Sequence, residues 1–354
     1  MIDWLTFDVV CPHDPAVFSA GFVLCVDANG ETEWMSKRRL VVPGSYDSKI
    51  TVKAAPGSDP GIMLRFSGNP TKWLQGHNIF GSDDLRGLAR DLVVGVFAAF
   101  NHPLDPQTIS ALQMGAFTLL RVDINYSWLV PTGPDALEFI RSLSASAYLL
   151  HRGRGELTKE STCSWGKGSQ YWWMKAYHKG TELKDKGHML PLDLAATPSL
   201  VQHADRCVRF EVQLNSKELK RRGLNVAAAW HDCTPSELHS GYLQRLEISD
   251  ATMSRKQTPP PGLPDKLMAV YQLWADGHDL RKLYPRATWY RHRKALKEYG
   301  INIAVQQPRK DDAEKVVPLR SVLVAQPAGI PEWAIGTKLY HEPAANILGP
   351  KLVA

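Results

Sequence analysis

The sequence predicts an α+β protein, in which a central antiparallel sheet has helices packed on one face and a smaller, mainly helical C-terminal domain follows. Three stretches, residues 119–128, 171–183 and 207–214, alternate apolar and polar side chains, as β-strands do when one face is buried. Apolar residues recur at helical spacing after residue 82 and again after residue 132. A proline-rich segment then separates these elements from a basic helical region.

The first eighty residues are predicted to form β-strands. Residues 22–26 and 32–35 flank an Ala-Asn-Gly sequence at 28–30, which is typical of a hairpin turn. The stretches 47–54 and 61–67 alternate in the same way. We therefore expect this part of the chain to contribute several strands to the sheet.

Two helices are predicted between these strands and the later ones. Ser82 is expected to cap the first helix. Its apolar stripe consists of Leu85, Leu88, Leu92, Val96 and Phe100. Thr132 and Pro134 begin the second helix, which runs to about Leu150. Both helices should pack on the apolar face of the sheet.

The stretch after the second helix, HRGRGELTKE (151–160), is polar and basic. It can be interpreted as a solvated loop or as a strip that binds single-stranded DNA. The sequence does not decide between these two interpretations.

The polar faces of the three alternating stretches carry residues capable of chemistry. They read R-x-D-x-N, K-x-Y-x-K and R-x-E-x-Q, and consist of Arg121, Asp123, Asn125, Lys175, Tyr177, Lys179, Arg209, Glu211 and Gln213. If these strands are neighbours, two carboxylates, a tyrosine and several cations converge on one surface. Carboxylate oxygens suit Mg²⁺ or Mn²⁺ rather than Zn²⁺. The alternative is a set of surface salt bridges between the strands.

Tyr177 lies between two lysines, Lys175 and Lys179, and is a candidate nucleophile toward a phosphodiester. The cations would bind the phosphate and favour the phenolate over the phenol, whose ordinary pKa is about 10. The same pattern also occurs on ordinary solvated strand faces. Taken by itself, the pattern is compatible with a catalytic and with a structural tyrosine.

The chain divides into residues 1–253, a linker at 254–265 and a C-terminal domain at 266–354. Three consecutive prolines in the linker preclude a helix there. The C-terminal domain contains a helix, a turn at Tyr284-Pro285 and a basic helix, which is the pattern of a DNA-binding helix-turn-helix. Its candidate DNA contacts are Arg286, Arg291, Arg293 and Lys294. An ordinary basic helical hairpin is the alternative.

The composition permits DNA as a partner without proving it. The 354 residues carry a formal net charge of +6, which is compatible with a polyanionic ligand. The five cysteines include no C-x-x-C pair, so neither a disulfide framework nor a structural zinc site is expected, and a reducing cytoplasm fits. The sequence has no run of eighteen apolar residues and no recognisable signal peptide, so no membrane partner is expected.

Four longer stretches are distinctive: NPTKWLQGHNIFGSDDL (69–85), LLRVDINYSW (119–128), STCSWGKGSQYWWMKAYHKGTELK (161–184) and CVRFEVQLNSKELKRRGL (207–224). In this order they resemble the filamentous-phage gene II replication proteins, the II/X family of rolling-circle initiators. A weaker match covers TWYRHRKALKEYGI (288–301) and VVPLRSVLV further on. By this resemblance, Tyr177 occupies the position of the family's nicking tyrosine.

The resemblance implies a phage DNA replication initiator that nicks and closes origin DNA and starts rolling-circle replication. Tyr177 would form a covalent 5′-phosphotyrosyl intermediate, with Lys175 and Lys179 stabilising charge on the phosphate. Asp123 and Glu211, with His77 of the QGHN loop, would hold Mg²⁺ or Mn²⁺. Many rolling-circle nickases carry a histidine–hydrophobe–histidine motif, whereas this chain has Asp-Ile-Asn, which leaves the ligand set open.

The implied partners are double-stranded replicative-form origin DNA, the displaced single strand, and the helicase and polymerase of the host. Arg121 and Arg209 are further candidate DNA contacts, and the cytoplasm of the host bacterium is the expected location. Two alternative functions are a noncatalytic DNA-binding regulator and a metal-dependent nuclease that uses water as its nucleophile.

Overall fold

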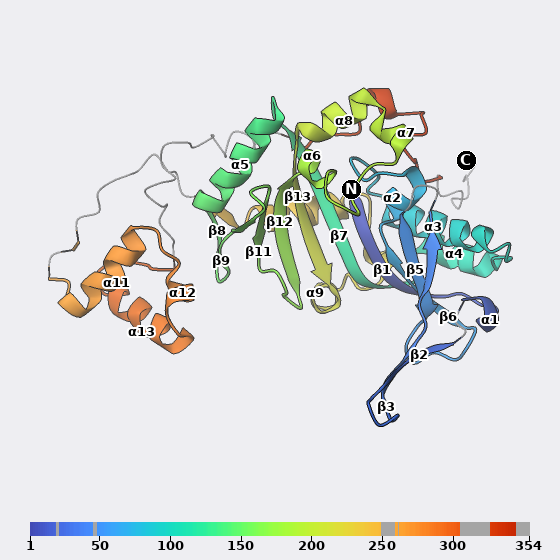
Figure 1. Cartoon of the computed structure of the whole chain (residues 1–354), viewed down its shortest axis with the longest axis horizontal. Coiled ribbons are helices and arrows are strands. Elements are labelled where there is room, and N and C mark those ends of the chain that lie inside the picture. The colour runs from blue at the N-terminus through green and yellow to red at the C-terminus, as the bar shows by residue number, and fades with distance from the viewer. Residues whose placement is uncertain (19–20, 45–47, 249–258, 261, 305–325, 345–354) are drawn as a thin grey trace, which may run out of the picture.

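The computed structural model describes residues 1–18, 21–44, 48–248, 259–260, 262–304 and 326–344, and its centre is one nine-stranded sheet (Figure 1). Every strand pairing within this sheet is antiparallel. In spatial order the strands are β10 (Glu156–Thr158), β11 (Thr162–Trp165), β12 (Trp172–His178), β13 (Cys207–Asn215), β7 (Thr118–Leu129), β1 (Ile2–Val10), β6 (Met63–Gly68), β5 (Lys49–Ala54) and β4 (Leu40–Pro43). The central antiparallel sheet expected from the sequence is confirmed.

Strand β1 begins the chain but lies in the middle of the sheet, between β7 and β6. Its residues alternate, so that Leu5, Phe7 and Val9 are buried on one side. Phe7 stacks on Phe66 of β6 with a centroid distance of 5.4 Å. Because burying a large apolar side chain contributes about 1.5–3 kcal/mol, this strand joins the two halves of the sheet through a shared core.

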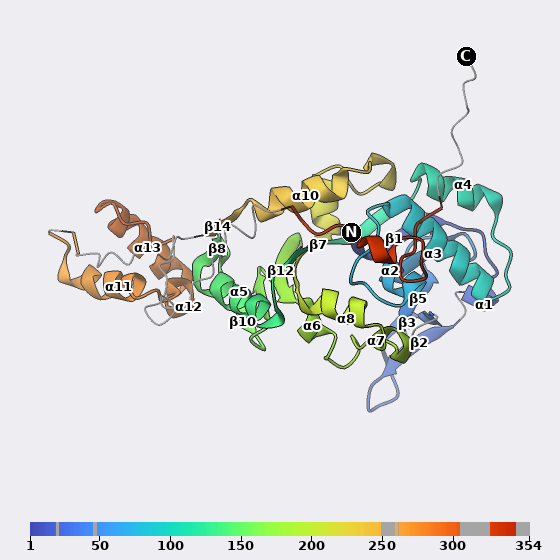
Figure 2. The same ribbon diagram turned by 90° about the horizontal axis from the view of Figure 1, so that it is seen from above.

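Helices cover the apolar side of the sheet and share one hydrophobic core with it. The main ones are α3 (Leu85–Ala99), α4 (Pro106–Met114), α5 (Gly133–Ser146), α9 (Ser216–Arg221) and α10 (Thr234–Leu243). Shorter segments are α1 (Pro15–Phe18), α2 (Pro70–Gln75) and the 3₁₀ turn η1 (Ala227–Ala229). In Figure 2 the sheet is seen from above, with α5 near one end of it and α3 and α4 near the other.

Two expectations about these helices need correction. Asp84 rather than Ser82 caps α3, because the Asp84 carboxylate accepts the N–H of Gly87 at 2.9 Å. The Ser82 hydroxyl instead accepts the N–H of Asp84. Thr132 caps α5 as expected, but that helix ends at Ser146 because the next three residues form strand β8 (Ala147–Leu149).

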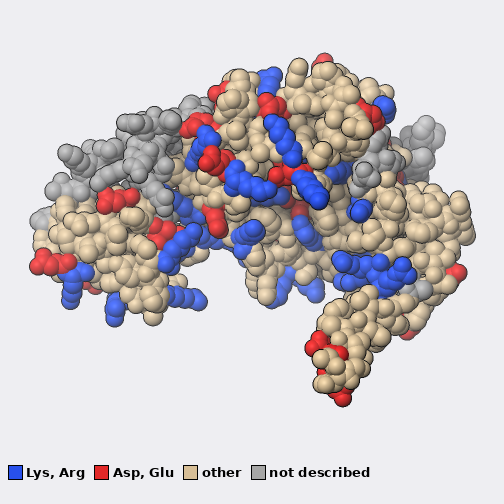
Figure 3. Space-filling view, in the orientation of Figure 1, with Lys and Arg blue, Asp and Glu red and all other residues tan. Residues whose placement is uncertain are grey.

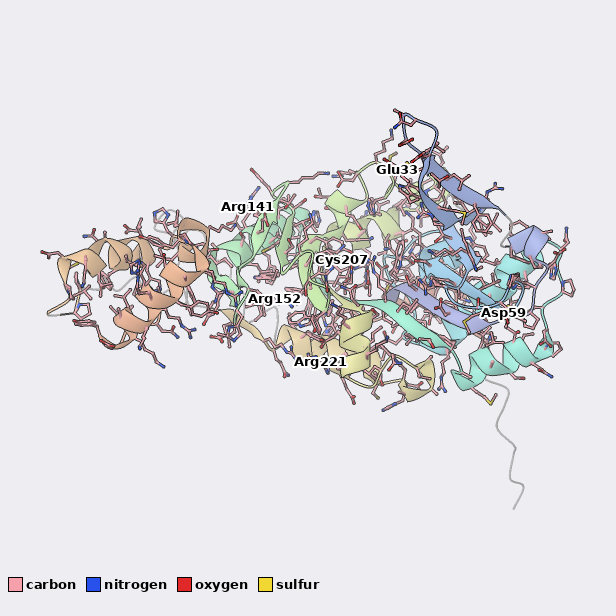
Figure 4. All side chains as sticks on the ribbon, turned by 90° about the horizontal axis from the view of Figure 1, so that it is seen from below. Glu33, Asp59, Arg141, Arg152, Cys207 and Arg221 are labelled. Atoms are coloured by element: carbon pink, nitrogen blue, oxygen red, sulfur yellow. The ribbon has the colours of Figure 1, made fainter. Side chains whose placement is uncertain are left out.

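Two smaller sheets accompany the main one. Strand β8 pairs with β9 (Gly153–Arg154) and with β14 (Leu246–Ile248). The expected hairpin forms from β2 (Phe22–Val26) and β3 (Thr32–Lys37), and it projects away from the sheet; Glu33 marks it in Figure 4. Gly30 adopts the positive φ of 86° that its turn requires.

A separate helical unit follows, made of α11 (Asp265–Ala275), α12 (Leu280–Leu283) and α13 (Arg286–Lys297) (Figure 1). It has a hydrophobic core of its own, which includes Leu263 and Trp289. Half of the expected linker, residues 254–258 and 261, lies outside the described residues. Leu263 and Asp265 already belong to the helical unit, so the linker ends earlier than expected. Among the described helices, none is long and apolar enough to cross a membrane.

Residues 326–344, which we call the C-terminal strap, do not join this helical unit. The strap includes the 3₁₀ turn η3 (Glu332–Ala334), and its apolar residues share a hydrophobic cluster with residues 79–80 and with α8 (Pro198–Asp205). The expected C-terminal domain, 266–354, is therefore divided in the structure: its helices form one unit, and the strap packs on the sheet domain. The VVPLRSVLV stretch lies outside the described residues.

Candidate active site

The three strands with polar faces are neighbours, in the order β12, β13, β7. Lys175, Glu211 and Asn125 face one another across these strands, because Glu211 pairs in register with both of the others. Tyr177 and Arg209 form the next pair along the strands. On the side of the molecule shown in Figure 3, lysine and arginine side chains gather over the middle of the sheet with acidic side chains between them. The convergence of these groups on one surface is confirmed.

Tyr177 lies at the centre of this surface and is only 3% exposed. Its hydroxyl donates to Glu211 Oε2 at 3.2 Å, and Lys175 Nζ lies 3.1 Å from the same oxygen. Burial, together with the negative charges of Glu182 and Glu211, raises the pKa of Tyr177 well above its ordinary value of 10. The expectation that neighbouring cations favour the phenolate is therefore wrong for this conformation, because burial and two carboxylates outweigh the opposing charge of Arg209.

Lys179 does not share the face of Tyr177 as a strand residue. Strand β12 ends at His178, and Lys179 is the first residue of α6 (Lys179–Glu182). Its ammonium is fully buried, donates to Asn78 Oδ1 at 2.7 Å and forms an ion pair with Glu182. Lys179 therefore joins α6 to the QGHN loop, and the strand-face argument holds only for Lys175.

Asp123 is buried and is held by Arg121, whose guanidinium donates to both carboxylate oxygens at 2.8 and 2.6 Å. Burial raises the pKa of Asp123 to about 7, and the negative charges of Glu211 and Asp3 act in the same direction. Asp3, on β1, is also buried and accepts hydrogen bonds from the amides of Asn69 and Asn78. Sequence reasoning missed Asp3, because a single acid in a hydrophobic first strand carries no recognisable motif.

Asn125 lies between these carboxylates and a small cavity, and its side chain is the least satisfied polar group of the site. It is 1% exposed, and neither its amide nitrogen nor its amide oxygen has a hydrogen-bond partner among the described residues. The cavity beside it has a volume of about 240 Å³ and is also lined by Arg209 and Phe80. A buried amide without partners costs about 1–3 kcal/mol, which makes Asn125 a candidate contact for an added ligand.

His77 is buried, and both of its ring nitrogens are already used. Nε2 bonds to the carbonyl of Leu339 at 2.8 Å, and Nδ1 accepts the N–H of Ile79 at 3.2 Å. Burial lowers the pKa of His77 to about 4. Within the described ranges, no group of three or more His, Cys, Asp or Glu side chains is placed to hold a metal ion. The structure does not bring His77 to Asp123 and Glu211 as a ligand.

Arg209, expected to contact DNA, is completely buried. Its Nε donates to Ser127 Oγ at 3.1 Å, and its other nitrogens donate to the carbonyls of Asn78 and Ile79. It therefore fixes the QGHN loop over the sheet and has no surface to offer DNA. Arg121, in contrast, keeps 34% of its side chain exposed.

The C-terminal strap covers the cavity beside Asn125 and Arg209, and nothing in its sequence suggested this position. Besides the bond from Leu339 to His77, the N–H of Ala328 donates to the carbonyl of Ser127 at 2.7 Å. Trp333 contacts the ring of Phe80 edge-on at 5.7 Å. The strap therefore covers His77, Phe80 and the cavity beside Asn125, whereas α6, which follows directly on β12, lies next to Tyr177.

Three of the candidate DNA contacts of α13, Arg286, Arg291 and Lys294, are exposed, and Arg293 is half-buried. Arg286 and Arg293 lie over the aromatic rings of Tyr290 and Trp289, at 5.9 and 5.5 Å from the centroids. The order helix, turn, helix is present, but α12 has only four residues, so its use as a helix-turn-helix in DNA binding stays a prediction.

Comparison with known proteins gives consistent matches along the chain. A family model for the N-terminal part of the phage Replication-associated protein, the gene II product, matches residues 1–233, and a model for its C-terminal part matches residues 264–340. The Replication-associated protein of Enterobacteria phage I2-2 is 38% identical over 335 residues, which cover 94% of this chain and 95% of that protein. The protein of the same name from Enterobacteria phage fd is 27% identical over 358 residues, covering 86% and 84%.

Among solved structures, a rolling circle replication initiator protein from Geobacillus stearothermophilus matches 73% of this chain and 89% of its own, with 12% identity and a TM-score of 0.30. A TM-score of this size is too low to establish a shared fold.

Proposed function

Since the chain belongs to the family of gene II Replication-associated proteins of filamentous phages, we propose that it initiates phage DNA replication by nicking and closing origin DNA through Tyr177. The observation that carries this proposal is the hydrogen bond from the Tyr177 hydroxyl to Glu211, beside the Lys175 ammonium. Two adjacent strands thereby bring together a nucleophile (Tyr177), an acceptor for its proton (Glu211) and a cation (Lys175).

In the proposed reaction, the Tyr177 oxygen attacks the scissile phosphorus while its proton passes to Glu211. An oxygen–phosphorus bond to tyrosine forms and the bond to the 3′-oxygen breaks, so that a 5′-phosphotyrosyl end and, after uptake of a proton from water, a free 3′-hydroxyl result. Lys175 stabilises the charge that develops on the phosphate. The reverse reaction by a later 3′-hydroxyl closes a single-stranded circle and frees the tyrosine.

The raised pKa of Tyr177 is compatible with this role, because its proton is removed only as the bond to phosphorus forms. Glu211 accepts the proton at the required distance. The 3% exposure of Tyr177 requires that segments packed around it move when DNA enters. Helix α6, which begins two residues after Tyr177, is one of these segments. The described conformation is therefore the closed state of the proposed site.

We propose Mg²⁺ or Mn²⁺ as the ion, because the site supplies oxygen donors; the bond from Arg121 to Asp123 would have to open for the ion to bind there. Asp123 and Glu211 supply carboxylates, and the unpartnered amide oxygen of Asn125 lies in the same part of the sheet. His77 does not fit, because both of its nitrogens are bonded elsewhere. When bound, the ion would supply Lewis-acid polarisation of the scissile phosphate.

Duplex origin DNA is proposed to bind the outward side of α13 through Arg291 and Lys294, with Arg121 nearer to the reacting strand. The exposed 3′-hydroxyl would then serve a host polymerase, and the displaced strand a host helicase, in the cytoplasm of the bacterium. Arg209 and Lys179 take no part in DNA contact in this proposal, since both are buried.

The test is to incubate the full chain with labelled supercoiled replicative-form DNA and Mg²⁺ and to look for DNA that remains attached to protein under denaturing conditions. We expect a nicked circle with the label on the protein, and no such product from Tyr177→Phe. Nicking without attached protein would support a nuclease that uses water. Binding without nicking would support a noncatalytic regulator.

A further inference from the structure

A second pocket lies away from Tyr177, between the turn that joins β8 to β9 and the helices α12 and α13. Its volume is about 530 Å³. The pocket is lined by His151, Arg281, Tyr284, Arg286, Trp289 and Tyr290. All six side chains are aromatic or cationic, and none is acidic. In Figure 4 the labelled Arg152, next to His151 in the chain, marks the edge of the sheet domain that faces the helical unit.

Arginines already lie against the aromatic rings of this pocket. The Arg281 guanidinium is 4.7 Å from the centroid of Trp289, and Arg286 is 5.9 Å from that of Tyr290. Tyr290 is 48% exposed, so one aromatic surface is open to a ligand. The indole N–H of Trp289 is buried and has no hydrogen-bond partner among the described residues. The pocket therefore offers an aromatic surface, several positive charges and an unused donor.

We propose that this pocket binds one unpaired nucleotide of single-stranded DNA. The proposal rests on the proposed function, because it supposes that the protein separates or displaces DNA strands. The base would stack on Tyr290, and the adjoining phosphate would lie against Arg286 and Arg281. Stacking of this kind requires a free base face, and the faces of bases within a duplex are covered by their neighbours.

Helix α13 thereby carries two kinds of DNA contact on two sides. Arg286, Trp289, Tyr290 and Arg293 repeat at intervals of three and four residues and so share one side of the helix. Arg291 lies on another side of the helix, is exposed and is free to meet duplex phosphates. Lys294, four residues after Tyr290, lies next to that ring. We therefore expect the side with Tyr290 to bind unpaired DNA and the side with Arg291 to bind paired DNA.

One residue of the stretch 151–160 takes part in the pocket. His151 begins this stretch and forms one wall of the pocket, with a positive φ of 67° in the turn. The residues that follow enter strands β9 and β10, so the proposed contact to single-stranded DNA involves His151 and not the whole stretch.

The experiment measures equilibrium binding of the full chain, without divalent ions, to a fluorescent thymidine strand of about 20 nucleotides and to a duplex of equal length, over a series of salt concentrations. A third ligand is the same strand with abasic sites in place of its bases. The variants are Tyr290→Ala, Tyr290→Phe and Arg291→Ala. Leu283→Ala, at an equally exposed position of the same unit, serves as the matched control.

Tyr290→Ala should weaken binding to the thymidine strand by about 5- to 100-fold, leave duplex binding unchanged within about twofold, and keep the salt slope, since no phosphate contact is lost. Its effect should disappear on the abasic strand, and Tyr290→Phe should bind as the unchanged chain does. Arg291→Ala should weaken binding to the duplex and lower the salt slope of duplex binding by roughly 0.9, while binding to the thymidine strand stays within about twofold. Thermal unfolding controls for a folding defect.

The proposal is overturned if Tyr290→Ala binds the thymidine strand as tightly as the unchanged chain, or if it loses duplex affinity by the same factor. These outcomes are independent of the covalent product at Tyr177. If the chain forms the covalent product but Tyr290→Ala binds the thymidine strand normally, only the pocket proposal is refuted. If Tyr290→Ala weakens strand binding but the chain forms no covalent product, only the nicking function is refuted.

Discussion

Tyr177 and Tyr290 are both flanked by cations, yet they lie in opposite surroundings. Tyr177 is 3% exposed and bonded to Glu211, whereas Tyr290 is 48% exposed and has Arg286 over its ring. The first is attached to a rigid nine-stranded sheet, and the second lies on a helix of a small separate unit.

The difference shows that a tyrosine flanked by cations can have different roles, which depend on the burial and the partners of its side chain. A carboxylate that accepts the hydroxyl proton allows transfer of that proton, and the Tyr177 hydroxyl is bonded to one, Glu211. An open ring face allows stacking, and Tyr290 provides it. We therefore assign bond formation to one tyrosine and base contact to the other, and the following predictions test this division.

The largest expected effect comes from removing the two hydroxyls in turn. Tyr177→Phe should lower formation of the covalent product by roughly 10⁴-fold or more, because the attacking oxygen is lost. Tyr290→Phe should change neither nicking nor binding, since its ring remains. The amount of labelled DNA that stays on the denatured protein measures product formation by both variants. Covalent product from Tyr177→Phe would show that another tyrosine attacks, and Tyr171, which is 46% exposed, would be examined first.

Glu211→Gln removes the proton acceptor and keeps the size of the side chain. We expect nicking to fall by about 10²- to 10⁴-fold, the usual contribution of a general base, while DNA affinity is retained. Single-turnover rates at saturating protein give the comparison. Glu237→Gln, on the surface of α10, is the control. An unchanged rate would reduce Glu211 to a structural partner of Lys175.

Removing the C-terminal strap should uncover His77 and the cluster around Phe80 in the sheet domain and leave the surroundings of Tyr290 unaltered. A chain that ends at Ala325 loses the buried contacts of Ile330 and Leu339 with the cluster around Phe80. We expect a loss of roughly 2–4 kcal/mol in the free energy of unfolding of the sheet domain, measured by urea denaturation. No change in stability would mean that the strap is not held in solution. A chain that ends near Thr258 lacks both the helical unit and the strap. Such a chain therefore cannot show whether origin recognition is separate from cleavage.

Acid should destabilise the sheet domain through a histidine remote from Tyr177. His239 bonds to the carbonyl of Phe210 on the apolar side of the sheet, and burial lowers its pKa to about 4. Because the unfolded chain takes up this proton near pH 6.5 and the folded chain does not, stability present above pH 6.5 is lost as the pH falls toward 4. The loss at pH 5 is about 2 kcal/mol.

Replacing His239 by Gln should flatten this part of the stability curve, as measured by urea denaturation at pH 7 and pH 5. The result also bears on the comparison of the two tyrosines, because it separates the effect of acid on the stability of the fold from the effect of acid on the nicking rate. An equal slope in the variant would assign the acid sensitivity to other groups.

The parts of the site that follow from local alternation could be predicted. A strand has a period of two residues, so Lys175 with Tyr177, and Arg121 with Asp123, share faces as expected. Antiparallel pairing of three such strands then brings Glu211 to Tyr177. The prediction failed at Lys179 because alternation does not show where a strand ends.

What could not be predicted depends on contacts between distant parts of the chain. Helix α6, next to Tyr177, is joined to the QGHN loop by the bond from Lys179 to Asn78, about 100 residues apart in the sequence. The partner of His77 is more than 250 residues away. Such packing sets the pKa of Tyr177 and removes Arg209 from the surface. No local pattern records which loop covers which strand, so the exposure of each site residue had to come from the structure.

The position of the strap also has a consequence for the newly made protein. A ribosome completes β13 at Asn215 and must add roughly 130 further residues before Ala344 is made. At about 5–20 residues per second, this takes on the order of ten seconds. During that interval every strand of the site exists while His77 lacks the Leu339 carbonyl and the cluster around Phe80 lacks its cover. The nascent chain thus lacks the last contacts of its QGHN loop, and the last described segment to be synthesised supplies them.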